Sequence, residues 1–350
     1  MATAAVQKGV TVRRPARGFV TPLTVIAIGV VLLLALAGLQ TSGSIFGQGI
    51  LSAFTPLVGI MVLAAAGQAL VIGTGGIDLS VPSAITVVGI IMLKFPDGQD
   101  SMLAQAIIVS LVAVILMGLT NGILVEIFGL NSLVVTLAVG MLAIGFARLY
   151  RGQILNVSSV PPLLVEFSGN NVAGISFILI ASFVLAGFAT FVTWMTVSGR
   201  RLVASSASVA AGTLVGLKAR FYRILAYVLA AVLYGVGGIL LSGLLRTPDL
   251  TIGAPYLLAP IVAVVLGGAV LTGGRVSFVA TVCGALFVSL LTLNLQVAGL
   301  TGGAPDLVQG LVLALGLTMV FLLRDKKVLR SLRSRRNAGG NEALLQGSVH

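Results

Sequence analysis

The residues most able to do chemistry lie in the stretch GTGGIDLSVPS, residues 73–83, between two long apolar runs. Its carboxylate, Asp78, stands where the flanking sequence predicts a membrane interior. An ionisable residue in that setting usually faces a bundle interior or an aqueous cavity and marks a functional site. The neighbouring glycines and proline would interrupt a helix, which is tolerated at membrane depth only where protein or a cavity covers the backbone. Asp78 could also cap a helix that begins near Leu79, and the two roles are compatible.

Uncharged polar side chains extend this candidate site. Asn121, Thr136 and Asn294 lie within apolar runs and could line a path, although such side chains more often bond one membrane helix to another. Glu126 lies near a predicted helix end, where a solvated or interface carboxylate is expected. The residues predicted to line a path are Gly75, Gly76, Asp78, Ser80, Asn121, Thr136 and Asn294.

Several kinds of chemistry lack the side chains that they need. The only histidine is His350, the last residue, and the only cysteine is Cys283, inside an apolar run. A metal site, a disulfide and a His-based catalytic triad are therefore not expected. The sequence also contains no G-x-x-x-x-G-K-[ST] motif, so the chain has no ATP-binding P-loop of its own. We predict no catalytic residue and no cofactor, and we regard a membrane enzyme as the least favoured class.

The composition identifies the kind of protein that must position these residues. Of the 350 residues, 58% are hydrophobic and only 9% are charged, whereas soluble domains are about one quarter charged. So few charges cannot cover a water-facing surface of this size. The apolar runs far exceed the ~10-residue alternating strands of a membrane barrel, so we predict an all-α integral membrane protein.

Ten apolar segments are each close to the ~20 residues needed to cross the hydrocarbon core. The first follows a basic stretch and is too long for a cleaved signal peptide, so it is interpreted as an uncleaved anchor. We therefore predict about ten transmembrane helices, one of them re-entrant or broken. The segments are 19–39, 50–73, 79–95, 102–127, 130–150, 173–197, 221–245, 252–272, 276–297 and 305–323.

The basic residues indicate how the chain is oriented. With ten crossings, 17 of the 21 Lys and Arg residues fall on one face, in the two tails, in residues 198–223 and at Arg275. This asymmetry follows the positive-inside rule with both termini cytoplasmic, and it accounts for the net charge of +12 without a nucleic-acid partner. We predict a basic tail over 1–18, one membrane domain over 19–323, and a second basic tail over 324–350, mostly disordered.

Two stretches of the sequence resemble each other. GTGGIDLSVPSA at 73–84 and LTGGRVSFVA at 271–280 each follow an apolar run, and each places a Gly-Gly turn and a serine before the next segment. Internal repeats with Gly- or Pro-broken segments are frequent near the substrate path of transporters. Small residues are also common in membrane helices in general.

Three motifs in collinear order resemble a known family. They are GGIDLSV at 75–81, NGILVEIFGLNSLVVTLAVGM at 121–141 and LGGAVLTGGRVSFVATVCGALFVSLL at 266–291. Over roughly residues 20–325 the chain resembles the permease subunits of bacterial ATP-binding-cassette (ABC) importers for monosaccharides, of the ribose, xylose and galactose type. The resemblance implies an ABC importer type II-like bundle in the bacterial cytoplasmic membrane.

The resemblance also implies a role for residues 198–223 as the loop that docks on a cytoplasmic ATPase. This chain departs from the family pattern there, because Ala210 stands where a glutamate is usual. That departure leaves open a homodimer or a heterodimer with a paralogous permease. The residues predicted to couple to the ATPase are Ala204, Ser208, Ala210, Ala211, Gly212, Gly216, Leu217 and Lys218.

The predicted machine has two permease chains, two ATPase subunits and a periplasmic or lipid-anchored sugar-binding protein. The chain would form the path for a monosaccharide or a similar polyhydroxylated solute, with an autoinducer-like or polyol solute as a rival. The alternative function is an ion-driven secondary transporter that uses Asp78. Such carriers tend to hold paired intramembrane carboxylates, and they have no use for a long docking loop.

Overall fold

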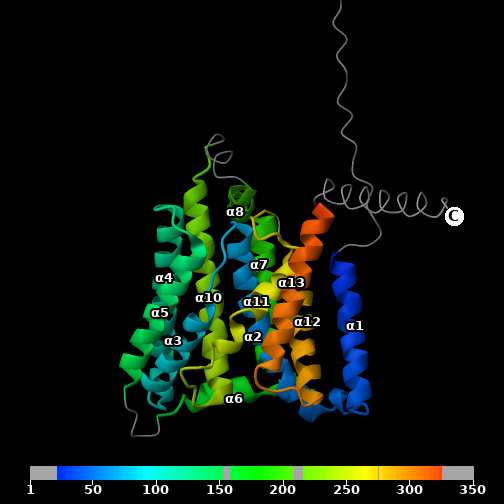
Figure 1. Ribbon diagram of the computed structural model, residues 1–350. Helices are drawn as coiled ribbons and strands as arrows, with labels where there is room; N and C mark the ends of the chain where they lie inside the picture. The colour runs from blue at the N-terminus through cyan, green and yellow to red at the C-terminus, as the bar shows by residue number, and fades with distance from the viewer. Residues whose placement is uncertain (1–21, 153–157, 208–215, 275, 325–350) are drawn as a thin grey trace, which may run out of the picture.

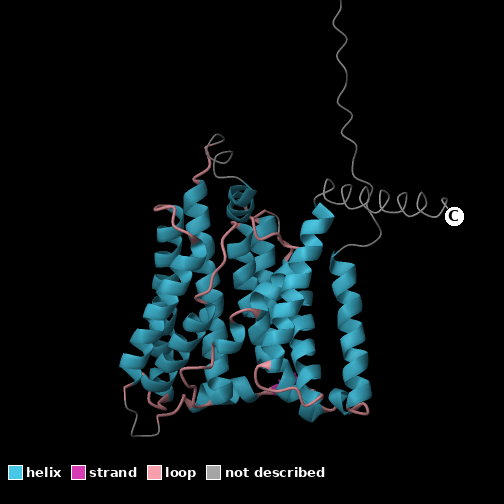
Figure 2. Ribbon diagram, viewed as in Figure 1, coloured by secondary structure: helices cyan, strands magenta, loops and turns pink. Residues whose placement is uncertain are grey.

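The computed structural model describes residues 22–152, 158–207, 216–274 and 276–324, and most of this part of the chain is helical (Figures 1 and 2). The prediction of an all-α membrane protein is confirmed. The helices are α1 (Pro22–Gln40), α2 (Gln48–Gly73), α3 (Val81–Lys94), α4 (Leu103–Glu126), α5 (Ser132–Arg151), α6 (Pro162–Gly169), α7 (Phe177–Met195), α8 (Val197–Ala207), α10 (Ala219–Leu245), α11 (Ala259–Leu266), α12 (Phe278–Val297) and α13 (Ala304–Arg324). Short 3-10 turns are η1 (Ser44–Phe46), η2 (Asp100–Met102) and η3 (Ala254–Tyr256), and strands β1 (Asn171–Val172) and β2 (Ile175–Ser176) form one hairpin.

The predicted count of ten transmembrane helices is not confirmed. Among the described residues, six helices are long and apolar enough to span a membrane, or seven if α7 and α8, bent by 81°, form one span. Each remaining predicted segment also contains a helix, but α3 has 14 residues and α11 only eight. At 1.5 Å per residue, neither covers a ~30 Å hydrocarbon core. The rest of each predicted segment is not α-helical, and that of the second includes a turn at residues 267–268.

The described ends of the chain lie on the same side of the bundle. Figure 1 shows the start of α1 and the end of α13 at the end of the molecule where α8 lies, and α6 at the opposite end. This arrangement agrees with the even number of crossings that the charge pattern requires.

The centre of the bundle is formed by α2 and α10. Most residues of both helices are buried, whereas α1 is largely exposed at one edge and packs mainly on α12. Glycines let α10 approach α4 closely: a Cβ on Gly118 would lie 2.7 Å from the carbonyl oxygen of Tyr227, and one on Gly122 would lie 3.0 Å from Cα of Ile224. Small residues serve membrane helix pairs in this way because lipid supplies no hydrophobic force between them.

Candidate functional site

The helix interruption at Asp78 is present. α2 ends at Gly73 and α3 begins at Val81, so residues 74–80 connect them and belong to neither helix. Gly75 has φ +88°, a left-handed conformation that side chains other than glycine seldom adopt. Gly76 has no room for a side chain, because a Cβ there would collide with the hydroxyl of Tyr227. We name residues 74–80 the broken segment.

Hydroxyl side chains of α5 bind the backbone of the broken segment. The N–H of Ile77 donates to Ser132 Oγ at 3.2 Å, and the N–H of Leu79 donates to Thr136 Oγ1 at 2.9 Å. The Thr136 hydroxyl itself donates to the Ser132 carbonyl at 2.8 Å. These bonds replace the helical partners that the broken segment lacks, which is the condition for irregular backbone within a membrane.

Asp78 is the centre of a buried polar cluster. Its carboxylate is 1% exposed, and Oδ1 accepts hydrogen bonds from the Ser80 N–H at 2.8 Å and from Ser80 Oγ at 2.6 Å. Asn121 Nδ2, from α4, donates to Ser80 Oγ at 2.9 Å. The predicted capping role is therefore only partly right. The Asp78 side chain accepts from the N–H two residues later and so closes a turn that precedes α3. Ser80, the residue just before the first helical residue, makes no capping hydrogen bond with its own side chain.

Gln68 of α2 fixes the backbone of Asp78 from the other side. With its amide oriented by its neighbours, Nε2 donates to the Asp78 carbonyl at 3.1 Å and to the Tyr234 hydroxyl at 3.2 Å, and Oε1 accepts from the Asp78 N–H at 3.2 Å. Gln68 was not predicted as a site residue from the sequence. A polar residue in the apolar run AAAGQALVIG was the available signal, as it was for Ser132 at the start of α5.

Part of the cluster has no protein partner. Asp78 Oδ2, Asn121 Oδ1 and the Tyr227 hydroxyl are buried and make no hydrogen bond to the described residues. Buried polar groups are nearly always paired. Other such atoms are scattered over the bundle, among them Asn294 Oδ1, whereas these three lie around one helix interruption. The structure thus brings together Gly75, Gly76, Asp78, Ser80, Asn121 and Thr136 of the predicted set.

Asn294 is not part of this cluster. Its Nδ2 donates to Leu33 O of α1 at 3.2 Å and to Leu290 O within α12 at 2.8 Å. It thus bonds one helix to another, which was the alternative role weighed for the uncharged polar residues.

Of the two roles expected for Glu126, the structure shows the interface carboxylate and not the solvated one. The residue is 9% exposed, and its Oε2 lies 3.1 Å from Arg223 Nε of α10. The close approach of α4 and α10 brings these two charges together.

The second Gly-Gly turn contacts the first. Gly273 has φ +89°, close to the value at Gly75, and each glycine N–H bonds to the carbonyl three residues earlier. The Gly274 N–H donates to the Gly73 carbonyl at 2.9 Å. The two resembling stretches of sequence therefore adopt similar turns and lie side by side at the broken segment.

A groove of about 440 Å³ leads to the broken segment along α5. It is lined by Leu79, Pro82 and Ser83, by Ala254 and Leu257, and by residues of α5 that include Leu137, Met141, Ile144 and Arg148. Arg148 lies in the last turn of α5, and Leu79 belongs to the broken segment itself. The groove thus touches the broken segment at Leu79, beside the polar cluster, while Asp78, Ser80 and Asn121 are not among its lining residues.

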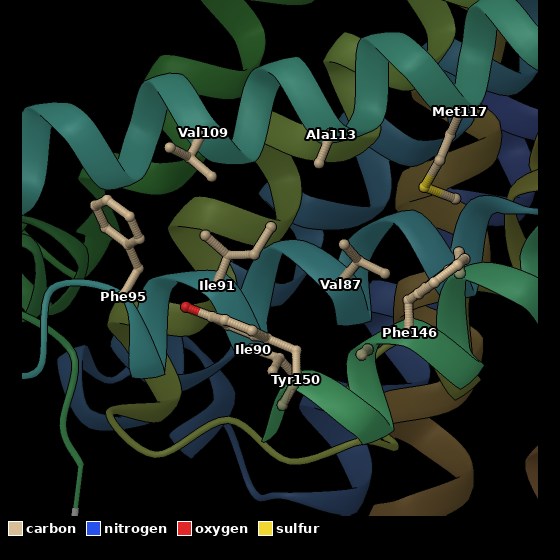
Figure 3. A pocket seen from close by; sticks show the side chains of 11 residues that line it. Val87, Ile90, Ile91, Phe95, Val109, Ala113, Met117, Phe146 and Tyr150 are labelled. Carbon is tan, nitrogen blue, oxygen red and sulfur yellow. The ribbon is translucent and has the colours of Figure 1, made fainter. Parts of the chain in front are cut away.

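A second groove has a different character. It has a volume of about 500 Å³ between α3, α4 and α5, where Ile91, Val109 and Phe146 point toward one another (Figure 3). Its lining is apolar except for Tyr150, whose ring lies 4.9 Å from Lys94 Nζ. Such a surface offers almost no hydrogen bonds to a polar solute.

The residues predicted to couple to an ATPase are described in part. Ala204 is exposed on α8, Gly216 has φ +75°, and Lys218 immediately precedes α10. Leu217 is half-buried, and with its neighbours and Arg201 it lines a groove of about 470 Å³. Ser208, Ala210, Ala211 and Gly212 lie outside the described residues.

Metal ligands do not gather in the described part of the chain, where no group of three or more His, Cys, Asp or Glu side chains could hold an ion. The fold and the site together define a membrane transport subunit: a bundle of apolar helices with a polar, helix-breaking centre and no catalytic constellation.

The comparisons identify the family. A model described as branched-chain amino acid transport system / permease component matches residues 50–321, so the chain belongs to this family of ABC permeases. The galactofuranose transporter permease YtfT of Escherichia coli K12 is 31% identical, covering 79% of this chain and 80% of its own. The fructose import permease FruG of Bifidobacterium longum is 25% identical (94% and 98%), and the autoinducer 2 import permease LsrD of Salmonella typhimurium LT2 is 29% identical (77% and 82%). No solved structure matches the chain.

Family membership confirms several predictions. The chain is a multi-pass permease component of an ABC importer, a transport subunit rather than an enzyme. The family implies an ATPase, a binding protein and a second permease chain as partners, and the inner membrane as the location. Nothing in the comparisons favours the ion-driven carrier.

Proposed function

We propose that the chain forms the translocation path for a monosaccharide or a similar polyhydroxylated solute that an extracytoplasmic binding protein delivers. The observation that carries the proposal is the buried polar cluster of Asp78, Ser80 and Asn121 at a helix interruption. The groove along α5 touches this interruption at Leu79, the residue between Asp78 and Ser80. A solute rich in hydroxyl groups needs donors and acceptors of this kind. Relatives whose names specify galactofuranose and fructose support the solute class.

The groove suggests that one chain supplies half of the path. It is bounded by α5, whose other faces carry exposed apolar residues such as Leu142 and Leu149. In the proposed complex a second permease chain, identical or paralogous, lies beside α5 and completes the path. Switching between two packed arrangements of the pair then opens the groove alternately to either side.

ATP hydrolysis takes place on separate ATPase chains that dock on residues 204–218. We place this connection, and both tails over 1–18 and 324–350, in the cytoplasm, with 19–323 as the membrane domain. The support is the basic charge at one end of the bundle and the sharp bend that lays α8 across that end of α7.

The test is co-purification in mild detergent of the tagged chain, expressed with its neighbouring genes, followed by reconstitution. We expect an ATPase to remain bound, and uptake of labelled sugar to require both ATP and the binding protein. A second, different permease in the complex would establish the heterodimer. Uptake that needs no ATPase and follows an ion gradient would contradict the proposal.

Paired variants test the site itself. Asn121→Leu removes the donor to Ser80, whereas Asn294→Leu changes a matched amide that bonds α12 to α1. If the path passes the Asp78 cluster, uptake by the first variant falls about tenfold, and the second loses stability while retaining uptake. Equal loss of uptake in both variants, at equal amounts of folded protein, would count against the site.

A further inference from the structure

Arg223 stands apart from the other basic residues at its end of the bundle. Those residues indicate topology, and charges of that kind lie in water. The Arg223 side chain is only 20% exposed and lies against the Glu126 carboxylate, which is 6% exposed. Removing two charges from water is costly and is sustained only where the contacts are specific. Arg223 therefore needs an explanation other than topology.

The contacts of Arg223 join three elements. Its Nη2 donates to the carbonyl of Thr74, the residue that follows α2 and begins the broken segment. Its Nε lies 3.1 Å from Oε2 of Glu126, the last residue of α4. A guanidinium with several donors in a fixed plane can hold a carbonyl and a carboxylate together, which an ammonium group cannot do in the same geometry.

One turn further along α10, a second contact reaches the same backbone. Tyr227 packs its hydroxyl against Gly76, so closely that no side chain fits there. Residues four apart lie on one face of a helix. The first turns of α10 therefore contact the broken segment twice, at Thr74 and at Gly76, two residues before Asp78.

Along the chain, the same part of α10 adjoins residues 204–218, the region proposed to dock on the ATPase. The helix begins at Ala219, directly after Gly216, Leu217 and Lys218. α8 packs on α10, and Arg201 Nη1 of α8 lies 3.4 Å from the Tyr222 hydroxyl, the neighbour of Arg223. α8 thus contacts the first turns of α10 at Tyr222, and residues 216–218 run directly into these turns. A displacement of either one therefore moves the turn of α10 that carries Arg223.

We propose that Arg223, held by Glu126, is a positioning residue that transmits movement of the ATPase-docking region to the broken segment. The inference rests on the proposed function, because it assumes that an ATPase moves this region. It goes further by assigning the coupling between the docking region and the broken segment to the Arg223–Glu126 ion pair and the Thr74 carbonyl. When α10 moves, its contacts through Arg223 and Tyr227 move residues 74–76. The Asp78 cluster then moves with residues 74–76.

The first experiment measures the position of the broken segment without any ATPase. Cys283 is the only native cysteine, so Cys283→Ala with Leu79→Cys places one thiol in the groove. We expect Arg223→Gln or Glu126→Gln to change its rate of labelling by a membrane-impermeant maleimide about tenfold. Arg220, three residues earlier and exposed, also acts on Glu126 through its charge, but it does not bond to Thr74. Arg220→Gln is therefore the control for a lost positive charge alone and should change the rate much less than Arg223→Gln does.

The second experiment uses the complete transport complex. With Arg223→Gln or Glu126→Gln we expect normal co-purification of the ATPase and continued ATP hydrolysis, with uptake reduced about tenfold. A purely structural role would lower hydrolysis, assembly and uptake together. The charge-reversed pair Arg223→Glu with Glu126→Arg separates lost pairing from misfolding, and we expect it to recover part of the uptake.

Unchanged labelling together with unchanged uptake in the single variants would overturn the role of Arg223. A failure of the proposed function gives a different result, because the unmodified chain itself would then show no ATP-dependent uptake. In that case the labelling experiment still decides whether Arg223 positions the broken segment.

Discussion

The two Gly-Gly turns of the bundle share a sequence pattern and a backbone shape, but their surroundings differ. Gly75 and Gly273 have nearly the same φ, and each is preceded by threonine. The first turn leads into Asp78, whose neighbours on α2, α4 and α5 supply an amide, a second amide and two hydroxyls. The second leads to Ser277, whose hydroxyl accepts from the Ala280 N–H at 3.3 Å and caps α12. The first turn forms part of a polar site, and the second turn packs against it.

The comparison shows that a helix break alone does not make a site. Glycines set the conformation of both turns, and in the described part of the chain the first turn is the one that leads into a segment bonded to polar side chains of α2, α4 and α5, namely Gln68, Asn121, Ser132 and Thr136. The following variants test this distinction, from the largest expected effect to the smallest.

Asp78→Ala should have the largest effect. It leaves the Ser80 N–H and hydroxyl buried without their acceptor, at a cost of about 1–3 kcal/mol for each group. We expect uptake to be lost and thermal unfolding in detergent to occur at a lower temperature, with Asp78→Asn less affected because it keeps an acceptor oxygen. Normal uptake by both variants at wild-type expression would remove Asp78 from the site.

Gly76→Ala should be next, because its Cβ collides with the Tyr227 hydroxyl. Overpacking of this kind costs about 1–3 kcal/mol. Since that hydroxyl makes no hydrogen bond within 3.5 Å to the described residues, Tyr227→Phe alone should change stability little. We expect the double variant to recover part of the loss in thermal unfolding, and strictly additive effects would show that the contact is not the cause.

Gly273→Ala tests the supporting turn. The left-handed conformation costs a side-chain-bearing residue about 1–2 kcal/mol, and the new Cβ would lie 2.9 Å from the Gly75 nitrogen. Because the two turns touch, we expect the effects of Gly75→Ala and Gly273→Ala on unfolding to be non-additive. Independent effects would mean that the turns do not act as a unit.

Ser277→Ala should have the smallest effect. It removes one cap bond from α12, which is worth about 1 kcal/mol, and it touches no residue of the Asp78 cluster. Uptake should remain close to that of the unmodified chain while the unfolding temperature falls slightly. A large loss of uptake with little change in stability would falsify the division between site and support.

Much of this arrangement could be predicted from the sequence, for identifiable reasons. Low charge and long apolar runs require membrane helices, and glycines beside a carboxylate require a protected break. The similarity of 73–84 and 271–280 pointed to two related turns. All of these signals are local, so a single sequence displays them.

The remaining features depend on contacts between distant residues. The predicted number of spanning helices was not confirmed because the segments of α3 and α11 are apolar over their whole length, while only part of each is an α-helix. Gln68 and Ser132 were missed because one polar residue in an apolar run does not show what it faces. The sequence left open whether Glu126 is solvated or lies at an interface, because its partner, Arg223, is 97 positions away and resembled a topology signal.

The origin of the bonds that hold the broken segment has a consequence for biogenesis. The N–H groups of Ile77 and Leu79 bond to hydroxyls that are synthesised 55 and 57 residues later, on α5. An unsatisfied backbone group in lipid costs several kcal/mol. A nascent chain that ends at α3 therefore cannot release this stretch stably into the bilayer, and we expect the insertion machinery to retain the first three segments until α5 has emerged.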